Sequence, residues 1–523
     1  MAKQNGNGEK VKSMESWIWD AACSIRGAAD AAKYKDYILP LIFVKRLCDV
    51  FDDEIDRIAE KVKSRSKALQ LVERDKSLVR FYMPIRPKDP EKETTWDVIR
   101  TLSDKIGQQL TDILRSVAKE NTSLQGIIDR IDFNATTHGV RDIDDDRLSK
   151  LIEKISEKRL GLKDVEPDII GRSYEYLIRK FAEGSGQSAG EFYTPAEVGF
   201  IMAKIMDAEP GMEVYDPTCG SGGLLIKCEL VLEEKMKLKS KSKYAPLKLY
   251  GQEFTPATWA MSKMNMVIHD MEGEIEIGDT LKNPKFRNKN KLKTFDRIVA
   301  NPMWNQGKDS LPYINDDFFI NDDFGRFPAG SCGGKIDWGW MQHIYSSLND
   351  TGRAAVILDT GAASRGSGNQ GNNKEKDCRK WFVDNDLIEG VIYLPENLFY
   401  NTSAPGIIIF LNKAKKHKGK IYLMHAGKEF EKGDPKNYIP PASIDKIADY
   451  YKAFKEEEKF ARLVSKDEIV KNDYNISPSR YIQITDAEIY RPIGELVEEL
   501  SALEEEAAAI DAELKSIFEK LGV

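Results

Sequence analysis

Short β-type runs alternate with helical segments along this 523-residue chain from about Gly184 onward. Such alternation predicts an α/β domain with a largely parallel sheet, because successive parallel strands need a crossover connection that is usually a helix. In sheets of this kind ligands bind at the carboxyl ends of the strands. The predicted strands are residues 213–215, 247–250, 274–277, 295–300, 353–358, 387–394 and 406–411.

The chain before this region has a helical pattern. Leu39, Phe43, Leu47, Phe51 and Ile55 recur every four residues and draw one apolar helix face. We therefore expect a helical N-terminal domain over residues 14–163, after a disordered stretch of Gly, Asn and Lys at 1–13.

A strict heptad pattern ends the chain, which predicts coiled-coil packing over residues 491–523. A helix packed back on its own domain is about equally compatible with the pattern, and we favour a partner helix. Within it, residues 493–521 carry nine acidic residues and two lysines, so they account for the whole formal charge of −7. The apolar seam is formed by Ile493, Leu496, Leu500, Leu503, Ala507, Ile510, Leu514, Ile517 and Leu521.

Composition excludes several classes of protein. A hydrophobic content of 41% is too high for a disordered chain. No apolar run approaches the ~20 residues that span a bilayer, and the N-terminus lacks a signal-peptide core. The six cysteines form no C-x-x-C pair and no cluster with histidine, so we expect a reduced, cytoplasmic protein without a metal site.

A glycine-rich turn joins the first predicted strand to a helix, from Asp216 through Gly220, Ser221, Gly222 and Gly223. Glycine lets backbone approach a ligand closely, and a helix N-terminus offers free N–H groups, so the turn suits an adenine-nucleotide-like ligand. It is neither a P-loop nor a G-x-G-x-x-G turn. By itself it is also compatible with plain turn geometry.

Polar residues follow three later strands: Glu253, Asp279 and the pair Asn301-Pro302. Each alone fits an ordinary turn or helix start. Because the carboxyl ends of parallel strands meet at one sheet edge, we expect these residues to lie near Asp216.

This ordered set resembles the S-adenosylmethionine (AdoMet)-dependent N6-adenine DNA methyltransferases, and most of all the modification subunit of type I restriction–modification systems. The glycine turn matches the family's methionine-binding turn, and Asn301-Pro302-Met303-Trp304 matches its Asn-Pro-Pro-aromatic catalytic motif. Residues 168–177, 394–399 and 475–481 resemble further family segments. The segment that packs against the cofactor in the family is matched by Glu191, Phe192, Tyr193, Thr194 and Pro195.

The resemblance implies a Rossmann-like AdoMet-dependent methyltransferase domain over residues 164–430, followed by a C-terminal extension at 431–490. It assigns the methionine part of AdoMet to Asp216 and the turn Gly220, Ser221, Gly222 and Gly223. It assigns the ribose hydroxyls to Glu253 and the adenine amine to Asp279.

For the target base, the resemblance implies that the side-chain oxygen of Asn301 and the carbonyl of Pro302 accept hydrogen bonds from adenine N6. Trp304 would stack on the flipped base, and Tyr193 would support the other side of the pocket.

The implied partners are DNA, a separate specificity subunit that docks on the 493–521 helix, and a restriction subunit, with two copies of this chain per complex. Two alternatives remain: a stand-alone adenine methyltransferase, and an AdoMet-binding scaffold with impaired catalysis. The second is motivated by Met303, which replaces the family's second proline.

Three other segments carry weaker expectations. The lysine-rich stretches at 235–248 and 282–293 should lie at the amino-terminal edge of the sheet, away from the site. The aromatic residues of 305–338 fit a position near DNA or buried packing equally well. The Gly-, Ser- and Asn-rich segment 361–376 is expected to be a mobile loop.

Overall fold

The chain forms two compact units, residues 1–482 and 483–523. The computed structural model describes residues 14–24, 31–165, 194–240, 243–289, 291–307, 309–369, 371–399, 402–433 and 436–483, together with 171, 173, 174, 176, 177, 180, 500, 501, 503, 504, 507 and 510. The predicted disordered stretch at 1–13 lies outside the described residues. No helix in the described ranges is long and apolar enough to cross a membrane.

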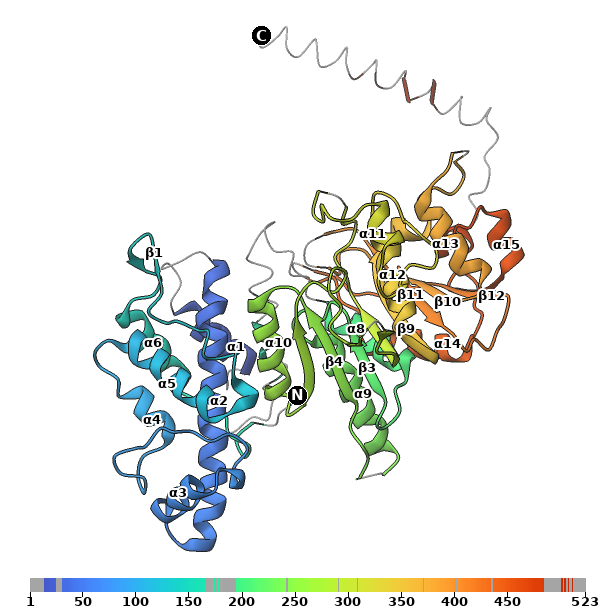
Figure 1. Ribbon diagram of the computed structural model, residues 1–523. Helices are drawn as coiled ribbons and strands as arrows, with labels where there is room; N and C mark the ends of the chain where they lie inside the picture. Colours follow the sequence, from blue (N-terminus) through green and yellow to red (C-terminus); the bar gives the residue numbers. More distant parts are fainter. Residues whose placement is uncertain are drawn as a thin grey trace, which may run out of the picture. The chain divides into compact units, whose positions relative to one another are not determined.

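The N-terminal region is helical, and its helices gather around the long helix α2 (Figure 1). The four-residue spacing noted above lies on α2, where Leu39, Phe43, Leu47, Phe51 and Ile55 are all buried in one apolar cluster. The α-helices are α1 (Met14–Cys23), α2 (Ala31–Val62), α3 (Arg65–Arg74), α4 (Thr95–Arg100), α5 (Ile106–Glu120) and α6 (Asp145–Ser156).

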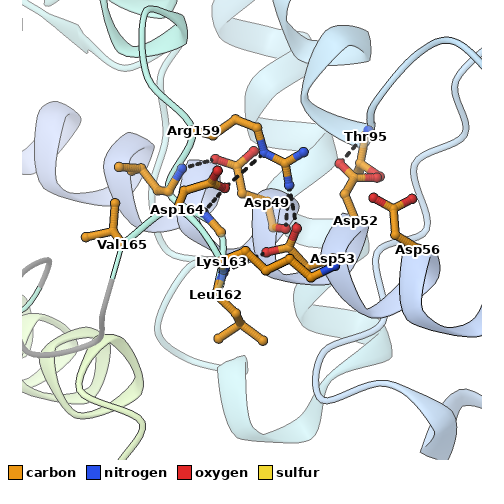
Figure 2. A network of polar contacts seen from close by, with 12 residues as sticks. Asp49, Asp52, Asp53, Asp56, Thr95, Arg159, Leu162, Lys163, Asp164 and Val165 are labelled. Atoms are coloured by element: carbon orange, nitrogen blue, oxygen red, sulfur yellow. Dashed lines mark hydrogen bonds and ion pairs between the residues drawn. The ribbon is translucent and has the colours of Figure 1, made fainter. Parts of the chain in front are cut away.

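A polar network built on two buried carboxylates of α2 holds the end of this region against that helix (Figure 2). Asp49 accepts a hydrogen bond from the backbone N–H of Leu160 at 2.6 Å, and Asp53 accepts one from the N–H of Leu162 at 2.6 Å. Arg159 pairs with Asp53 at 2.7 Å. Between these contacts Gly161 leaves no room for a side chain, because an added Cβ would lie 2.2 Å from Oδ2 of Asp53. Acidic residues on one helix thus hold a turn more than a hundred residues away in the chain.

The second region is built on a nine-stranded sheet with the order β13-β12-β10-β11-β9-β8-β3-β4-β5, counted over the described residues. The strands β3 (Glu213–Asp216), β4 (Lys248–Glu253), β5 (Gly273–Ile277), β8 (Phe295–Ala300) and β9 (Leu348–Asp359) pair in parallel. The chain winds outward from β3 to β5 and then returns to place β8 on the other side of β3. This reversal marks the point where doubly wound sheets bind ligands.

The remaining strands make the sheet mixed rather than wholly parallel. β11 (Gly406–Asn412) inserts antiparallel between β9 and β10 (Ile388–Tyr393). β12 (Lys420–His425) pairs in parallel with β10, and β13 (Ala461–Ser465) pairs antiparallel with β12. Sequence patterns missed β12 and β13. The short hairpins β1 (Thr136–Thr137) with β2 (Val140–Arg141) and β6 (Arg287–Asn288) with β7 (Lys291–Leu292) lie outside this sheet.

Helices pack on both faces of the sheet, as the alternation of side chains along β3 requires. Val214 shares one apolar cluster with residues of α8 (Ala196–Met206), α9 (Gly223–Leu238) and α14 (Pro441–Ala453). Tyr215 points to the other face, where its ring lies 4.5 Å from that of Phe295 and 6.5 Å from His343 of α12 (Asp337–Ser346). The other α-helices are α11 (Asp316–Ile320), α13 (Lys374–Asp384) and α15 (Lys466–Lys471).

Helix α10 (Pro256–Ile268) belongs to both regions. Met261, Met264 and Ile268 are buried in the apolar cluster of the N-terminal helices, whereas Met266 is buried in the cluster of the sheet. The indole of Trp259 packs against both clusters. The two regions therefore share one helix instead of meeting across a flexible joint.

Candidate active site

The four sequence-predicted polar positions all lie at the carboxyl ends of neighbouring parallel strands. Asp216 ends β3, Glu253 ends β4, Asp279 follows β5 by two residues, and Asn301 directly follows β8. Because these strands are adjacent in the order β8-β3-β4-β5, the structure brings the four residues to one edge of the sheet.

Hydrogen bonds tie the turns after β3, β4 and β5 to one another. The backbone N–H of Gly220 donates to Oε2 of Glu253 at 3.0 Å. The hydroxyl of Thr280 donates to the carbonyl of Pro217 at 2.7 Å. Asn265 of α10 donates to the carbonyl of Ser221 at 3.0 Å. The predicted ribose acid and the predicted methionine turn are therefore in direct contact.

The glycine turn has the backbone geometry that its sequence requires. Gly220 and Gly222 have φ values of 53° and 77°, a left-handed conformation that glycine adopts without strain. Gly222 is the N-cap of α9 and makes no side-chain cap hydrogen bond. The first N–H groups of α9 are thus left for a ligand, and an N–H donor set at a helix start suits an anionic group such as a carboxylate.

Asp216 is only 1% exposed, and its environment disfavours its charged form. Burial raises the pKa of Asp216 to about 8, and the nearby carboxylate of Glu253 adds to the rise. The hydrogen bond from the backbone N–H of Thr218, at 2.9 Å, acts in the opposite direction. A cationic group placed against this carboxyl would convert it to the carboxylate, so the position is suited to an ammonium ligand.

The side chain of Asn301 is held by two neighbours. Its Nδ2 donates to Oγ1 of Thr194 at 3.0 Å, and its Oδ1 accepts from the indole Nε1 of Trp304 at 3.1 Å. Trp304 lies edge-on to Phe399, with ring centroids 4.8 Å apart, and Gly406 on β11 leaves the space that these rings fill. The predicted residues Thr194, Asn301 and Trp304 therefore form one contact group.

The remaining predicted residues near this group divide into described and undescribed ones. Pro195 and Pro302 are buried beside it in the chain, whereas Glu191, Phe192 and Tyr193 lie outside the described residues. Met303 is 36% exposed, and its sulfur accepts a hydrogen bond from Gln306 at 3.4 Å. The methionine that replaces the family's second proline thus faces outward and leaves the contacts of Asn301 in place.

The glycine-rich segment expected to be mobile is instead anchored next to the catalytic motif. Arg365 pairs with Asp337, with Asp359 at 2.9 Å and with Glu375 at 2.6 Å. It also donates to the side chain of Asn305 at 2.9 Å. Because one half-buried cation joins three carboxylates, the expectation of mobility from Gly, Ser and Asn content was wrong for the described part of 361–376.

The structure also bears on the expectations for the aromatic residues of 305–338 and for the lysine-rich stretch at 282–293. The aromatic side chains of 305–338 pack on one another: the rings of Phe318 and Phe319 each lie against Phe327, at 5.3 and 4.9 Å. Lys293, at the end of the second lysine-rich stretch, pairs with Glu213 at 3.0 Å. Since Glu213 begins β3, this end of the stretch lies at the amino-terminal edge of the sheet, as expected. The expectation was wrong for its start, because the backbone N–H of Lys282 donates to Asp279 at the carboxyl edge.

Two features of the site were missed by the sequence patterns. Phe254, directly after Glu253, is 69% exposed at the carboxyl end of β4. The hydroxyl of Tyr313 donates to Oδ2 of Asp279 at 2.5 Å. An aromatic residue next to a strand-end acid was a signal for the first, whereas nothing local in the sequence indicates the second. No group of three or more His, Cys, Asp and Glu suited to a metal occurs in the part of the chain that the structure describes.

The doubly wound sheet, the glycine turn and the Asn-Pro motif at one edge define an α/β enzyme of the methyltransferase type. The family model for N-6 DNA methylases matches residues 165–489, and the model for the HsdM N-terminal domain matches residues 14–155. The chain therefore belongs to the N-6 DNA methylase family. Its activity is that of an adenine-specific DNA methyltransferase.

Relatives whose role is named align with most of the chain. The type I restriction enzyme MjaVII methylase subunit of Methanocaldococcus jannaschii is 31% identical over 85% of this chain and 74% of that protein. The MjaIX methylase subunit of the same organism is 29% identical over 98% of this chain and 92% of that protein. The crystal structure of a type I methyltransferase subunit from Streptococcus thermophilus matches with a TM-score of 0.73 and 25% identity, over 90% of this chain and 99% of that one. The role of the chain is that of the modification subunit of a type I restriction enzyme.

Proposed function

We propose that the strand-end residues bind S-adenosylmethionine and that Asn301 acts on the target adenine. The glycine turn Gly220–Gly223, with the first N–H groups of α9 that follow it, suits the methionine carboxylate, and Asp216 suits its ammonium group. Glu253 takes the ribose hydroxyls, Asp279 accepts from the adenine amine, and the exposed ring of Phe254 offers the adenine an apolar surface. The positive-φ glycines and the uncapped start of α9 support this fit.

The chemistry at the target base rests on the orientation of one amide. Adenine N6 is a weak nucleophile, because its lone pair is delocalised into the ring. Oδ1 of Asn301 and the carbonyl of Pro302 accept from its two N–H bonds and stabilise the charge that develops there. Trp304 stacks on the base after it leaves the duplex. When bound, AdoMet supplies a methyl group on a sulfonium, and the protein supplies orientation and acceptors.

The observation that carries this proposal is the contact of Asn301 with Thr194 and Trp304. Thr194 lies next to the segment 191–193 that resembles the family's cofactor-packing motif, so a single side chain links the two halves of the site. The direct test is methyl transfer from labelled AdoMet to DNA by the chain combined with its specificity subunit. Label on N6 of adenine supports the proposal, and label on another base or none at all contradicts it.

We further propose that the C-terminal helix docks the specificity subunit. Leu500, Leu503 and Ile510 of the heptad seam are 58%, 57% and 52% exposed. Because an exposed apolar seam on an acidic helix is costly in water, it suits a partner helix whose Lys and Arg flank its own apolar residues. DNA and a restriction subunit complete the assembly, which holds two copies of this chain in the cytoplasm.

The domain boundaries follow as part of the same proposal. Residues 14–163 form the helical domain, 164–430 the catalytic domain, 431–490 an extension and 491–523 the docking helix. The extension supplies α14 and β13, and β13 completes one edge of the catalytic sheet. The shared cluster of α8, α9 and α14 supports a close association of the extension with the catalytic domain.

A further inference from the structure

The segment that follows the catalytic motif returns to the turn after β5. Arg326, only 2% exposed, pairs with Asp322 at 2.6 Å and donates to the carbonyls of Thr280 at 3.2 Å and Leu281 at 2.7 Å. A buried, fully paired cation of this kind is costly to displace. The segment 309–333 is thus fixed against the turn that carries Asp279.

Tyr313 projects from this segment onto Asp279. Its hydroxyl donates to Oδ2 of Asp279 at 2.5 Å, and its ring lies 5.6 Å from that of Phe318. Burial and the contact with Asp279 raise the pKa of Tyr313 well above its ordinary value. The phenol therefore keeps its proton at neutral pH and remains the donor in this hydrogen bond.

Asp279 receives one donor on each carboxylate oxygen. The backbone N–H of Lys282 donates to Oδ1 at 3.1 Å, while Tyr313 donates to Oδ2. A carboxylate offers about four acceptor positions, so two remain open for a ligand. Rotation of the carboxylate would break both existing hydrogen bonds, which means that the direction of the open positions is set before a ligand arrives.

We propose that Tyr313 is a positioning residue of the cofactor site, which orients the Asp279 carboxylate toward the 6-amino group of the cofactor's adenine. The inference rests on the proposed role of Asp279. Through Tyr313, recognition of the adenine amine depends on the segment that directly follows the catalytic motif. Tyr313 acts through Asp279 and touches neither the methyl group nor the target base.

A double-mutant cycle on the complex with the specificity subunit tests this. The measured quantity is the dissociation constant of S-adenosylhomocysteine for the wild type, Tyr313→Phe, Asp279→Ala and the double variant. Tyr313→Phe keeps the ring packing and should weaken binding about tenfold, as expected for a hydrogen bond to a charged group. In the Asp279→Ala background the same change should have no further effect. For Tyr313→Phe, the methyl-transfer rate at saturating AdoMet should stay within about twofold of the wild-type rate, because the change weakens cofactor binding and leaves the transfer step itself intact.

A second readout separates positioning from general stability. Adenosine and purine riboside, which lacks the 6-amino group, are compared as competitors of S-adenosylhomocysteine. The wild type should bind adenosine more tightly than purine riboside. The ratio of these two affinities should be smaller for Tyr313→Phe. Tyr450→Phe is the matched control, because its hydroxyl also donates to a carboxylate, Oε2 of Glu457, at 2.5 Å, outside the site.

The outcomes distinguish this inference from the function on which it rests. If the wild type does not bind S-adenosylhomocysteine, the proposed cofactor site itself is wrong. If the wild type binds and Tyr313→Phe binds equally well, or loses the same affinity in the Asp279→Ala background, the positioning role is overturned.

Discussion

Nδ2 of Asn301 donates a hydrogen bond to Oγ1 of Thr194 at 3.0 Å, across 107 residues of sequence. A threonine hydroxyl can accept or donate, whereas an indole N–H only donates, so the two contacts together set which way the amide faces: Nδ2 points to Thr194 and Oδ1 points to Trp304. There Oδ1 accepts from the indole of Trp304 and keeps a second lone pair for a ligand. Thr194 and Trp304 together thus orient the amide oxygen that we propose accepts from adenine N6.

Replacing Thr194 tests this orientation. Thr194→Val keeps the side-chain shape but removes the acceptor, so Nδ2 of Asn301 loses its partner and the amide is held by Trp304 alone. We expect the methyl-transfer rate at saturating AdoMet to fall roughly tenfold to a hundredfold, the range seen when a transition-state acceptor is misplaced. Single-turnover transfer of labelled methyl groups measures it. Thr194→Ser keeps the hydroxyl and should restore most of the rate; equal losses in both variants would contradict the mechanism.

Asn301→Ala removes the acceptor altogether. Transfer should fall by at least about a thousandfold, because the developing charge on N6 loses its side-chain partner. Cofactor affinity should remain, since Asn301 lies after β8 and the proposed cofactor contacts follow β3, β4 and β5. Isothermal titration with AdoMet and a transfer assay on the same preparation give both values. Appreciable transfer by the variant would refute the role of Asn301.

The buried carboxyl of Asp216 predicts a pH-dependent cofactor affinity. Its pKa is raised to about 8, so the free protein holds this proton at neutral pH. A methionine ammonium favours the carboxylate, so binding releases the proton, and the affinity should rise with pH by up to about tenfold per unit between about pH 6 and about pH 8. Calorimetry in buffers of different ionisation enthalpy counts the released proton. Asp216→Asn should bind more weakly and lose this slope; a flat profile for the wild type would argue against an ammonium at Asp216.

Gly161 predicts a stability effect in the helical region. A Cβ at this position would lie 2.2 Å from Oδ2 of Asp53, so Gly161→Ala must disrupt the network of Figure 2. We expect a loss of about 2 kcal/mol, within the usual range for forced overpacking. Urea unfolding followed by circular dichroism measures it. Gly371→Ala is the control, because an added Cβ there has no neighbour within 4 Å. Equal midpoints for the two variants would show that the network tolerates the methyl group.

The exposed residues of the heptad seam predict that a substitution there weakens binding of the specificity subunit without affecting AdoMet binding. Leu503 is 57% exposed, and Leu503→Lys places a charge in the middle of the proposed helix pair. Affinity for the specificity subunit should fall by about a hundredfold, as for a central apolar anchor, while AdoMet binding by the chain is unchanged. Glu504→Gln, next along the helix but off the seam, should bind the subunit like the wild type. Normal assembly of the Leu503→Lys variant would place the interface elsewhere.

Local patterns predicted those parts of the molecule that local chemistry determines. The strand at 295–300 was predicted with its observed limits, and the positions of Asp216, Glu253, Asp279 and Asn301 followed from parallel topology. β12 and β13 were missed although they are as long as predicted strands; β12 pairs with β10, and β13 pairs with β12 at the edge of the sheet. At 361–376 a composition typical of mobile loops led to a wrong prediction, because Arg365 pairs there with carboxylates from three separate elements. The contacts of Thr194 with Asn301 and of Tyr313 with Asp279 join distant residues and leave no periodic trace.

Helix α10 has a consequence for how this enzyme can be divided. Removing the N-terminal helices would leave Met261, Met264 and Ile268 exposed to water, while the same helix donates through Asn265 to the glycine turn. A minimal catalytic fragment that starts after residue 165 would therefore expose an apolar stripe on the same helix that contacts the glycine turn, and such a stripe promotes aggregation. Engineers who wish to fuse this methyltransferase to another targeting module should keep the helical region whole and make their cut beyond residue 482, where the first compact unit ends.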